Sequence, residues 1–232
     1  MFPLYSDNTL TRFPFATTLL ILTNIAMYVH QVAMPGSLAQ SVWIYGVIPY
    51  DVFHPSALNV DGRIFLPLTF ISGMFSHGGL FHLLSNMLYL WVFGRDIEED
   101  FGFFRFLGFY LGIGIISSLV FVLAFPSANI PLVGASGAIS GILGGYFLRF
   151  PGRKIHTLFF LIIYIRILPI PAFVMLGYWF AIQFFSCVVN CTAGAAGNGG
   201  VAWLAHLAGF VAGLVWTILI LRKRYYERRR FA

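Results

Sequence analysis

The sequence predicts an all-α, polytopic membrane protein with six transmembrane helices. Of its 232 residues, 59% are hydrophobic and only 9% are charged, whereas soluble domains carry about 25% charged residues. Such a chain cannot cover a water-facing surface. The net charge of +6 does not indicate nucleic-acid binding, because the basic residues cluster at the ends of hydrophobic runs, as they do in cytoplasmic loops.

Six apolar segments account for the predicted spans. They lie at about 14–33, 80–94, 103–125, 134–149, 168–188 and 201–221. The second and the fourth are shorter than the roughly 20 residues that a complete span needs. A short helix can begin below the membrane surface only where protein or a water-filled cavity covers its end. Ser136, near the start of the fourth segment, is therefore expected below the surface and facing a cavity.

The segments outside the spans complete the predicted organisation. The chain divides into a short cytoplasmic N-terminus, a six-span core and a basic cytoplasmic tail: 1–13, 14–221 and 222–232. The long loop at about 34–78 is too polar to span and rich in aromatic residues, so we expect a structured loop at the membrane interface. The run 155–167 fits either the start of the fifth span or an interfacial piece, and Pro169 and Pro171 separate it from the next apolar residues.

Lysine and arginine predict the orientation of the spans. They flank the spans at Arg12, Arg95, Arg105, Arg149, Arg153, Lys154 and in the tail "LRKRYYERRR". The loops at about 126–133 and 189–200 carry neither residue type, and the long first loop carries only Arg63. The positive-inside rule then places both termini in the cytoplasm. Spans two, four and six therefore begin at the exterior side.

Polar side chains occupy these three exterior starts. His82 and Asn86 in "HLLSN" are four residues apart on one helix face. Ser136 opens the fourth span, and His206 lies near the start of the sixth. Polar groups inside a membrane are costly and indicate function by default. Other interpretations stay open: the serine as a small packing residue, the histidines as structural or proton-conducting groups, and the asparagine as a hydrogen-bonding link between helices.

Two ladders of small residues indicate how Ser136 and His206 can meet. The rungs are spaced by four residues: Gly137, Gly141 and Gly145 in the fourth span, and Ala205, Gly209 and Gly213 in the sixth. Small residues at this spacing let two helix backbones approach closely. Packing the ladders together would bring the serine and histidine within the roughly 2.6–3.2 Å of an activated nucleophile and its base.

Other intramembrane chemistries lack the residues they require. The chain has no His-Glu-x-x-His run for a zinc protease. All eight Asp and Glu residues lie outside the apolar spans, which excludes a paired-aspartate mechanism and leaves no carboxylate to orient His206. A Ser–His dyad is therefore favoured over a triad. A small transporter or channel is disfavoured by the lack of a repeated half and of an embedded acid. We expect neither a cofactor nor a metal.

Together these motifs resemble the rhomboid intramembrane serine proteases. The resemblance covers about 14–221, and three motifs carry it: His82-x-x-x-Asn86, Gly134-x-Ser136-Gly137 with Gly141, and Ala205-His206-x-x-Gly209-x-x-x-Gly213. It implies cleavage of transmembrane substrates by a Ser–His dyad, with Ser136 as nucleophile and His206 as general base. It further implies that His82, Asn86 and the backbone N–H of Ser136 stabilise the oxyanion.

The resemblance also assigns roles outside the catalytic groups. Glu98 in "GRDIEEDFG" matches a structural acid that ties loops together, and 189–200 matches a cap over the active site. The aromatic loop at 34–78 matches the family's interfacial loop. One position departs from the family: Ser140 stands where many members have an aromatic residue packed on the catalytic histidine. Bulk around His206 is then expected from Trp203 or Phe210.

The expected partners are single-span or polytopic membrane-protein substrates and the lipid bilayer. Nucleic acid is not an expected partner, and the sequence does not give the oligomeric state. The expected location is a prokaryotic plasma membrane, with the active site opening to the exterior side. The alternative is a catalytically silent rhomboid-like protein that binds membrane-protein clients. Such relatives typically lack the serine or the histidine, and this chain has both.

Overall fold

A computed structural model describes residues 2–54, 65–161, 164–192 and 202–230, and most of them are helical. The six expected spans correspond to α1 (Phe15–Ala33), α5 (Leu80–Tyr89) continued by the π-helix η2 (Leu90–Gly94), α7 (Phe103–Ala124), α8 (Ser136–Arg149), α9 (Ala172–Thr192) and α10 (Trp203–Arg230). Among the described helices, four are long and apolar enough to cross a membrane: α1, α7, α9 and α10. The two short segments are α5 and α8, as the sequence predicts.

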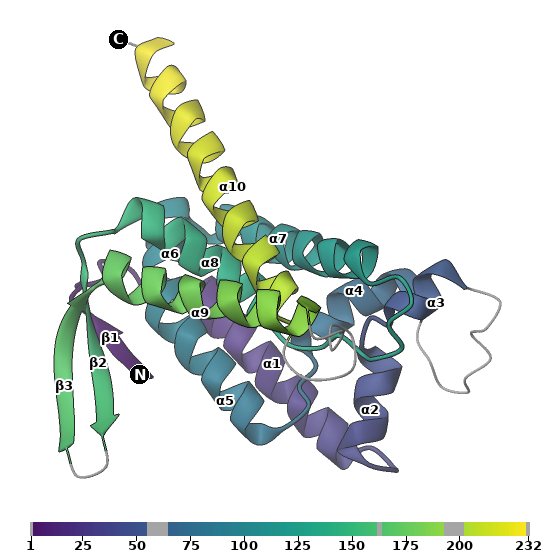
Figure 1. The fold of residues 1–232 in the computed structure, drawn as a ribbon. Coiled ribbons are helices and arrows are strands. Elements are labelled where there is room, and N and C mark those ends of the chain that lie inside the picture. Colours follow the sequence, from purple (N-terminus) through teal and green to yellow (C-terminus); the bar gives the residue numbers. More distant parts are fainter. Residues whose placement is uncertain (1, 55–64, 162–163, 193–201, 231–232) are drawn as a thin grey trace.

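The helices α1 and α5 lie side by side, α7 and α9 are inclined to this pair, and α10 rises steeply from the other helices (Figure 1). The core lies where α7 and α8 pack against η2. Phe93, Phe106, Ile113, Ile142 and Tyr146 are all fully buried there. The helix α10 continues beyond the sixth expected span to Arg230, so the residues 222–230 of the predicted tail extend this helix.

The first long loop is structured, as expected from its aromatic residues. It contains three short helices, α2 (Leu38–Tyr45), α3 (Pro49–Phe53) and α4 (Leu66–Phe75). Residues 55–64, including Arg63, lie outside the described part. The loop is attached to the connection before α8, because Val47 and Leu132 exchange two backbone hydrogen bonds of 3.1 and 2.7 Å. The position of this loop at the membrane interface stays a prediction.

A three-stranded antiparallel sheet is the main feature that the sequence analysis missed. It consists of β1 (Phe2–Ser6), β2 (Lys154–Leu161) and β3 (Tyr164–Pro171), in that spatial order. The described residues of the run 155–167 therefore form strands and not the start of the fifth span, while an interfacial position of this run stays a prediction. Pro169 and Pro171 lie in β3, an edge strand, where a missing backbone N–H is tolerated. The fifth span consequently begins only at Ala172.

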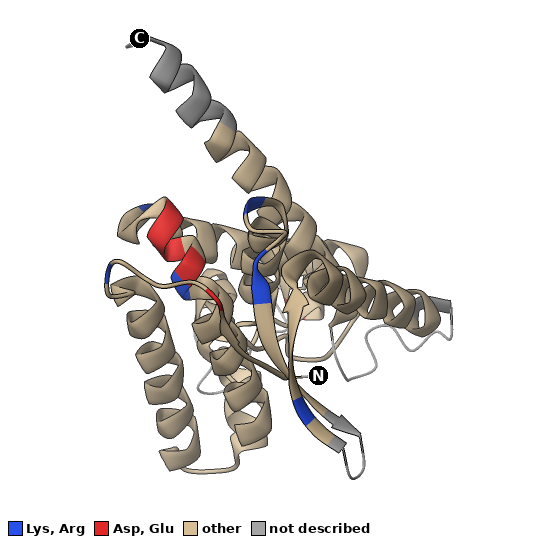
Figure 2. Ribbon diagram, turned by 90° about the vertical axis from the view of Figure 1, so that its left-hand side faces the viewer, with Lys and Arg blue, Asp and Glu red and all other residues tan. Residues whose placement is uncertain are grey.

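Charged side chains gather at the end of the molecule formed by the sheet and α6 (Arg95–Phe101), which faces the viewer in Figure 2. The buried carboxylate of Asp96 lies at the centre of this cluster. It accepts hydrogen bonds of 2.8 Å from the hydroxyls of Ser6 and Tyr146, and Arg153 lies 3.2 Å away. These contacts connect β1, α8 and the segment that leads into the hairpin, and they satisfy a charge that would be costly to bury alone.

Glu98, the second buried acid of α6, caps the first transmembrane helix. Its carboxylate oxygens accept hydrogen bonds from the backbone N–H groups of Ala16 (2.8 Å) and Thr17 (2.7 Å). The first N–H groups of a helix have no partner within the helix, and a negative charge at this end is favourable. Glu98 therefore joins α6 to the start of α1, which agrees with the role implied by the family resemblance.

Glu98→Ala is expected to destabilise the protein by about 1.5–3 kcal/mol, because two buried N–H groups lose a charged acceptor. Thermal unfolding of the purified protein in detergent measures this effect. Asp7→Ala is the matched control, since it removes an exposed carboxylate near the same end; surface changes of this kind usually stay within about 0.5 kcal/mol. Equal losses in the two variants would contradict the capping role.

Candidate active site

The turn before α8 places Ser136 at the wall of a cavity. Gly134 has a φ of 114°, in the left-handed region that favours glycine. A Cβ atom at this position would lie 2.7 Å from Nε2 of His82, so the close approach of α5 also requires glycine. Ser136 then begins α8, where backbone N–H groups have no partner within the helix.

Helices α8 and α10 touch through their backbones. A Cβ atom on Gly209 would overlap the carbonyl oxygen of Gly137, and one on Gly213 would overlap that of Gly141. Gly209 and Gly213 of the predicted α10 ladder therefore contact the backbone of Gly137 and Gly141 in α8, and a side chain at either α10 position would prevent so close an approach. The α8 ladder is turned differently. A Cβ atom on Gly137 or Gly141 would meet Ser117 or Ile113 of α7, whereas one on Gly145 would lie 2.9 Å from Oγ1 of Thr217 in α10.

This packing brings Ser136 and His206 together. Nε2 of His206 lies 2.8 Å from Oγ of Ser136, within the distance expected of a nucleophile and its base. The start of α10 is also tied to α7, because the hydroxyl of Ser117 donates to the carbonyl of Ala205 (2.7 Å). The histidine backbone is thus held against both α7 and α8.

The other ring nitrogen of His206 has a partner that the sequence analysis missed. Nδ1 lies 2.7 Å from Oε1 of Gln183, a buried side chain of α9. In the serine protease triad the orienting group is a carboxylate, and the apolar spans contain none. A usable signal was present, since Gln183 interrupts the apolar run "GYWFAIQFFSCVV", and a strongly polar residue inside a span is itself an indication of function.

Aromatic rings from other positions flank His206, because Ser140 stands where many family members have an aromatic residue. The ring centroids of Trp203 and Trp179 each lie 6.3 Å from that of His206. Trp203 was among the expected residues and Trp179 was not, while Phe210 stacks on Trp179 at 6.0 Å. The Ser140 hydroxyl donates to the carbonyl of Ser136, four residues earlier in α8 (2.7 Å), a common arrangement for serine in helices.

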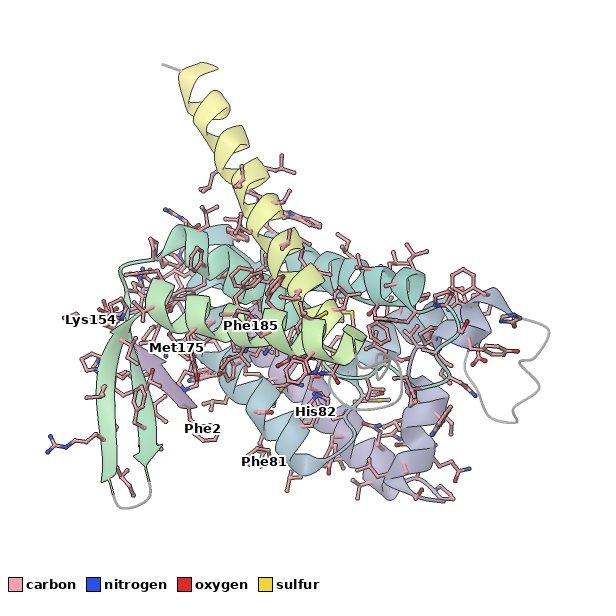
Figure 3. The ribbon with its side chains drawn as sticks, in the orientation of Figure 1. Phe2, Phe81, His82, Lys154, Met175 and Phe185 are labelled. Carbon is pink, nitrogen blue, oxygen red and sulfur yellow. The ribbon has the colours of Figure 1, made fainter. Side chains whose placement is uncertain are left out.

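His82 and Asn86 line the same cavity of about 620 Å³ as Ser136 and His206. All four predicted polar residues are therefore brought together. Figure 3 shows His82 on the side of α5 that faces α9, and the neighbouring Phe81, which is 74% exposed, on the outside. The cap expected at 189–200 lies mostly outside the described residues.

Asn86 is oriented by His77, which the sequence analysis also missed. Nδ1 of His77 lies 3.1 Å from the carbonyl oxygen of Phe75, which can only accept, so Nδ1 carries the proton. Nε2 then accepts from the Asn86 amide nitrogen at 3.0 Å. The second amide hydrogen of Asn86 stays available to the cavity.

The histidine behind Asn86 is itself held by residues from the first helices. The backbone N–H of His77 donates to Oε1 of Gln31 in α1 (3.0 Å), and Nε2 of Gln31 donates to the hydroxyl of Ser41 in α2 (3.1 Å). All three side chains are buried. The orientation of Asn86 thus depends on contacts between α1, α2 and the segment before α5.

Comparisons with known proteins give the same family throughout. The model of the Rhomboid domain matches residues 67–223. The chain is similar to the "Rhomboid protein 1, mitochondrial" of Saccharomyces cerevisiae, with 34% identity over 70% of this chain and 44% of that protein. It is also similar to the "Rhomboid protease GlpG" of Haemophilus influenzae, with 28% identity over 90% of this chain and 94% of that protein. The "RHOMBOID-like protein 4" of Arabidopsis thaliana is 34% identical over 64% of this chain and 33% of that protein. The chain thus spans less than half the length of the yeast and plant relatives.

Proposed function

This chain belongs to the rhomboid family, and from this premise we propose that it is an intramembrane serine endopeptidase that cleaves transmembrane segments of membrane proteins. Ser136 and His206 act as a catalytic dyad. The observation that carries the proposal is the 2.8 Å contact between Oγ of Ser136 and Nε2 of His206, at the wall of a cavity large enough for a stretch of extended peptide. The name of the bacterial relative, a rhomboid protease, supports the reaction class.

Acylation follows from the positions of these two side chains. Oγ of Ser136 attacks the carbonyl carbon of the scissile peptide bond, and its proton passes to Nε2 of His206. The electron pair of the carbonyl double bond moves to the oxygen, which becomes an oxyanion. When the C–N bond breaks, His206 returns the proton to the leaving nitrogen. One product then departs as an amine, and the other stays bound to Ser136 as an ester.

Deacylation uses the same groups with water as the nucleophile. His206 takes a proton from the water while the water oxygen attacks the ester carbonyl. The C–O bond to Ser136 then breaks, the serine oxygen regains its proton from His206, and the second product leaves as a carboxylic acid. The reaction consumes one water and returns the dyad to its starting state.

The oxyanion of both steps is stabilised by groups on two helices. The side chains of His82 and Asn86 approach from α5, and the backbone N–H of Ser136 lies at the positive end of the α8 dipole. Such donors act best when they are in place before charge develops. The contacts of Asn86 with His77 support this function, because they fix the direction of its amide before any substrate binds.

Asn86→Ala is expected to lower kcat by up to about 10²-fold, because one oxyanion donor is lost and others remain. His82→Ala should have a larger effect, since it also removes bulk beside Gly134. KM should change far less than kcat in both variants, because the contact forms fully only in the transition state. Steady-state cleavage of a single-span substrate measures both constants. Normal turnover by both variants would contradict the oxyanion role.

The chain is an integral membrane protein, and we propose that both termini are cytoplasmic and that the cavity opens to the exterior side. The charged end around α6 supports this orientation (Figure 2). Arg149 ends α8 at that charged end, and Ser136 begins the helix at the opposite one. The yeast relative is named as mitochondrial, so the comparisons do not support the prokaryotic plasma membrane expected from the sequence.

The deciding experiment combines cleavage with active-site labelling. Purified full-length protein in liposomes is incubated with a set of single-span substrates, and products are separated by mass. A fluorophosphonate probe, which reacts with activated serines, is added in parallel, and the modified residue is identified by mass spectrometry. Cleavage together with modification at Ser136 is the expected result. Neither cleavage nor modification would favour the silent, client-binding alternative.

A further inference from the structure

We infer that Gln183 is a positioning residue for the proposed reaction, holding His206 in the one orientation and tautomer that can accept the proton of Ser136. This inference rests on the proposed function. It replaces the dyad expected from the sequence with an ordered row of three side chains from three helices: Ser136 of α8, His206 of α10 and Gln183 of α9.

The imidazole ring of His206 is held at both nitrogens. Nε2 lies 2.8 Å from the Ser136 hydroxyl, and Nδ1 lies 2.7 Å from the amide oxygen of Gln183. Gln183 is only 6% exposed, so water does not compete freely for this hydrogen bond. The two tryptophan rings beside His206 limit its space, but a ring contact does not distinguish one nitrogen from the other.

The amide oxygen determines which nitrogen carries the proton. A neutral histidine has one N–H and one acceptor nitrogen. Because the oxygen of Gln183 can only accept, Nδ1 must be the N–H, and the lone pair of Nε2 then faces Ser136. The opposite tautomer would leave the Gln183 oxygen without a donor and present an N–H to the serine. That tautomer cannot take the serine proton.

A neutral amide suits this position better than a carboxylate would. The cavity lies among apolar helices. Of the buried acids in the described part of the chain, Asp96 and Glu98 lie on α6 at the other end of α8, and Asp51 lies on α3; none of them lines the cavity. A carboxylate beside His206 would need partners to be buried there. An amide orients the ring without adding a charge, and the burial of a neutral hydrogen-bonded group is far less costly.

Two substitutions distinguish the positioning of His206 by Gln183 from a purely structural contact between helices. Gln183→Leu keeps the approximate size of the side chain and removes the acceptor. We expect kcat to fall by about 10²-fold, a smaller loss than the roughly 10⁴-fold known when the wrong tautomer is imposed in a serine protease triad. KM should stay within about twofold, because the amide oxygen is engaged by Nδ1 of His206 and its loss acts on the chemical step. Asn24→Leu is the matched control: it removes a buried amide of α1 that does not line the cavity, one whose hydrogen bond goes to the carbonyl of Leu20.

Gln183→Glu tests the positioning role through the pH dependence of kcat, which would not change if Gln183 were only a structural residue. A carboxylate restores an acceptor for Nδ1 and favours the protonated imidazole. The enzyme should therefore stay active, and the acidic limb of its kcat–pH profile should move to higher pH, by about one unit. The other titratable side chains of the cavity are His82 and Tyr89 of α5 and Cys187 of α9. They are unchanged in the variant, so the shift would belong to position 183.

The measurements are cleavage kinetics over a pH series, the rate of fluorophosphonate labelling at Ser136, and thermal unfolding of each full-length variant. A fall in kcat for Gln183→Leu, with rescue and a shifted pH profile for Gln183→Glu, is the expected result. Unchanged kcat and pH profile in both variants would overturn the inference and leave the proposed function intact. So would a loss of thermal stability that Gln183→Glu repairs without a pH shift. Failure of the wild type to cleave or to be labelled would instead overturn the proposed function.

Discussion

Ser136→Ala is expected to reduce cleavage to below about 1% of wild type while thermal unfolding stays nearly unchanged. The substitution removes one oxygen atom from a site already built of small residues, so packing is hardly altered. The chemistry, in contrast, loses its nucleophile. Purified wild type and variant, compared at equal concentration on the same substrate, give the ratio directly.

His206→Ala should be as inactive as Ser136→Ala, and the double variant should be no worse than either. Residues that act as one unit show such non-additive losses. The double variant gives the sharper test. If the two residues contributed independently, the rate losses of the two single variants would multiply in the double variant. Residual cleavage above about 1% in Ser136→Ala, or a much weaker double variant, would contradict the assignment of these two residues as a catalytic pair.

Gly209→Val is expected to destabilise the protein and to abolish its cleavage activity. A Cβ at position 209 overlaps the backbone carbonyl oxygen of Gly137, and backbone cannot move aside as a flexible side chain can. Overpacking a tight contact typically costs about 1–3 kcal/mol. Separation of α8 from α10 also moves His206 away from Ser136, and a displacement of about 1 Å can reduce the rate roughly 100-fold.

Graded substitutions make this prediction specific to the contact. Gly209→Ala should already show much of the effect, because the overlap begins with the first side-chain carbon. Gly108→Val in α7 is the matched control, since a Cβ there has no described atom within 4 Å. Thermal unfolding and cleavage rate are measured for all three variants. If Gly209→Val turns over normally, α8 and α10 do not pack through this face.

The sequence was sufficient for the parts of the molecule that depend on local pattern. Hydrophobic runs predicted the helices and their order, and the mostly helical rhomboid fold is confirmed, with the added three-stranded sheet. The spacing of glycines predicted that the fourth and sixth spans would meet, because small residues four apart lie on one helix face. Ser136 and His206 each lie one residue from the first rung of the ladder in their own helix, which is why their encounter could be expected.

Features that depend on how distant segments meet were not predicted. The hairpin at 154–171 is as apolar as a span, so hydrophobicity alone could not separate strand from helix. Gln183 and His77 became visible as partners only once α9 and the segment before α5 were placed beside His206 and Asn86. The orienting position is occupied by an amide, which differs from the carboxylate of the serine protease triad. Buried polar residues of every type therefore need to be considered in such sequences.

The pairing of β1 with β2 also constrains how the chain is threaded through the bilayer during synthesis. Residues 2–6 are made before α1, and their partner strand is made only after α8. Ser6 can pair with Ile155 only if both strands end on the same side, which requires an even number of crossings between them. If the chain has the proposed six crossings, omission of α5 or α8 alone would leave β1 and β2 on opposite faces of the membrane. Closure of the sheet is thus a late step that only a correctly inserted chain can complete.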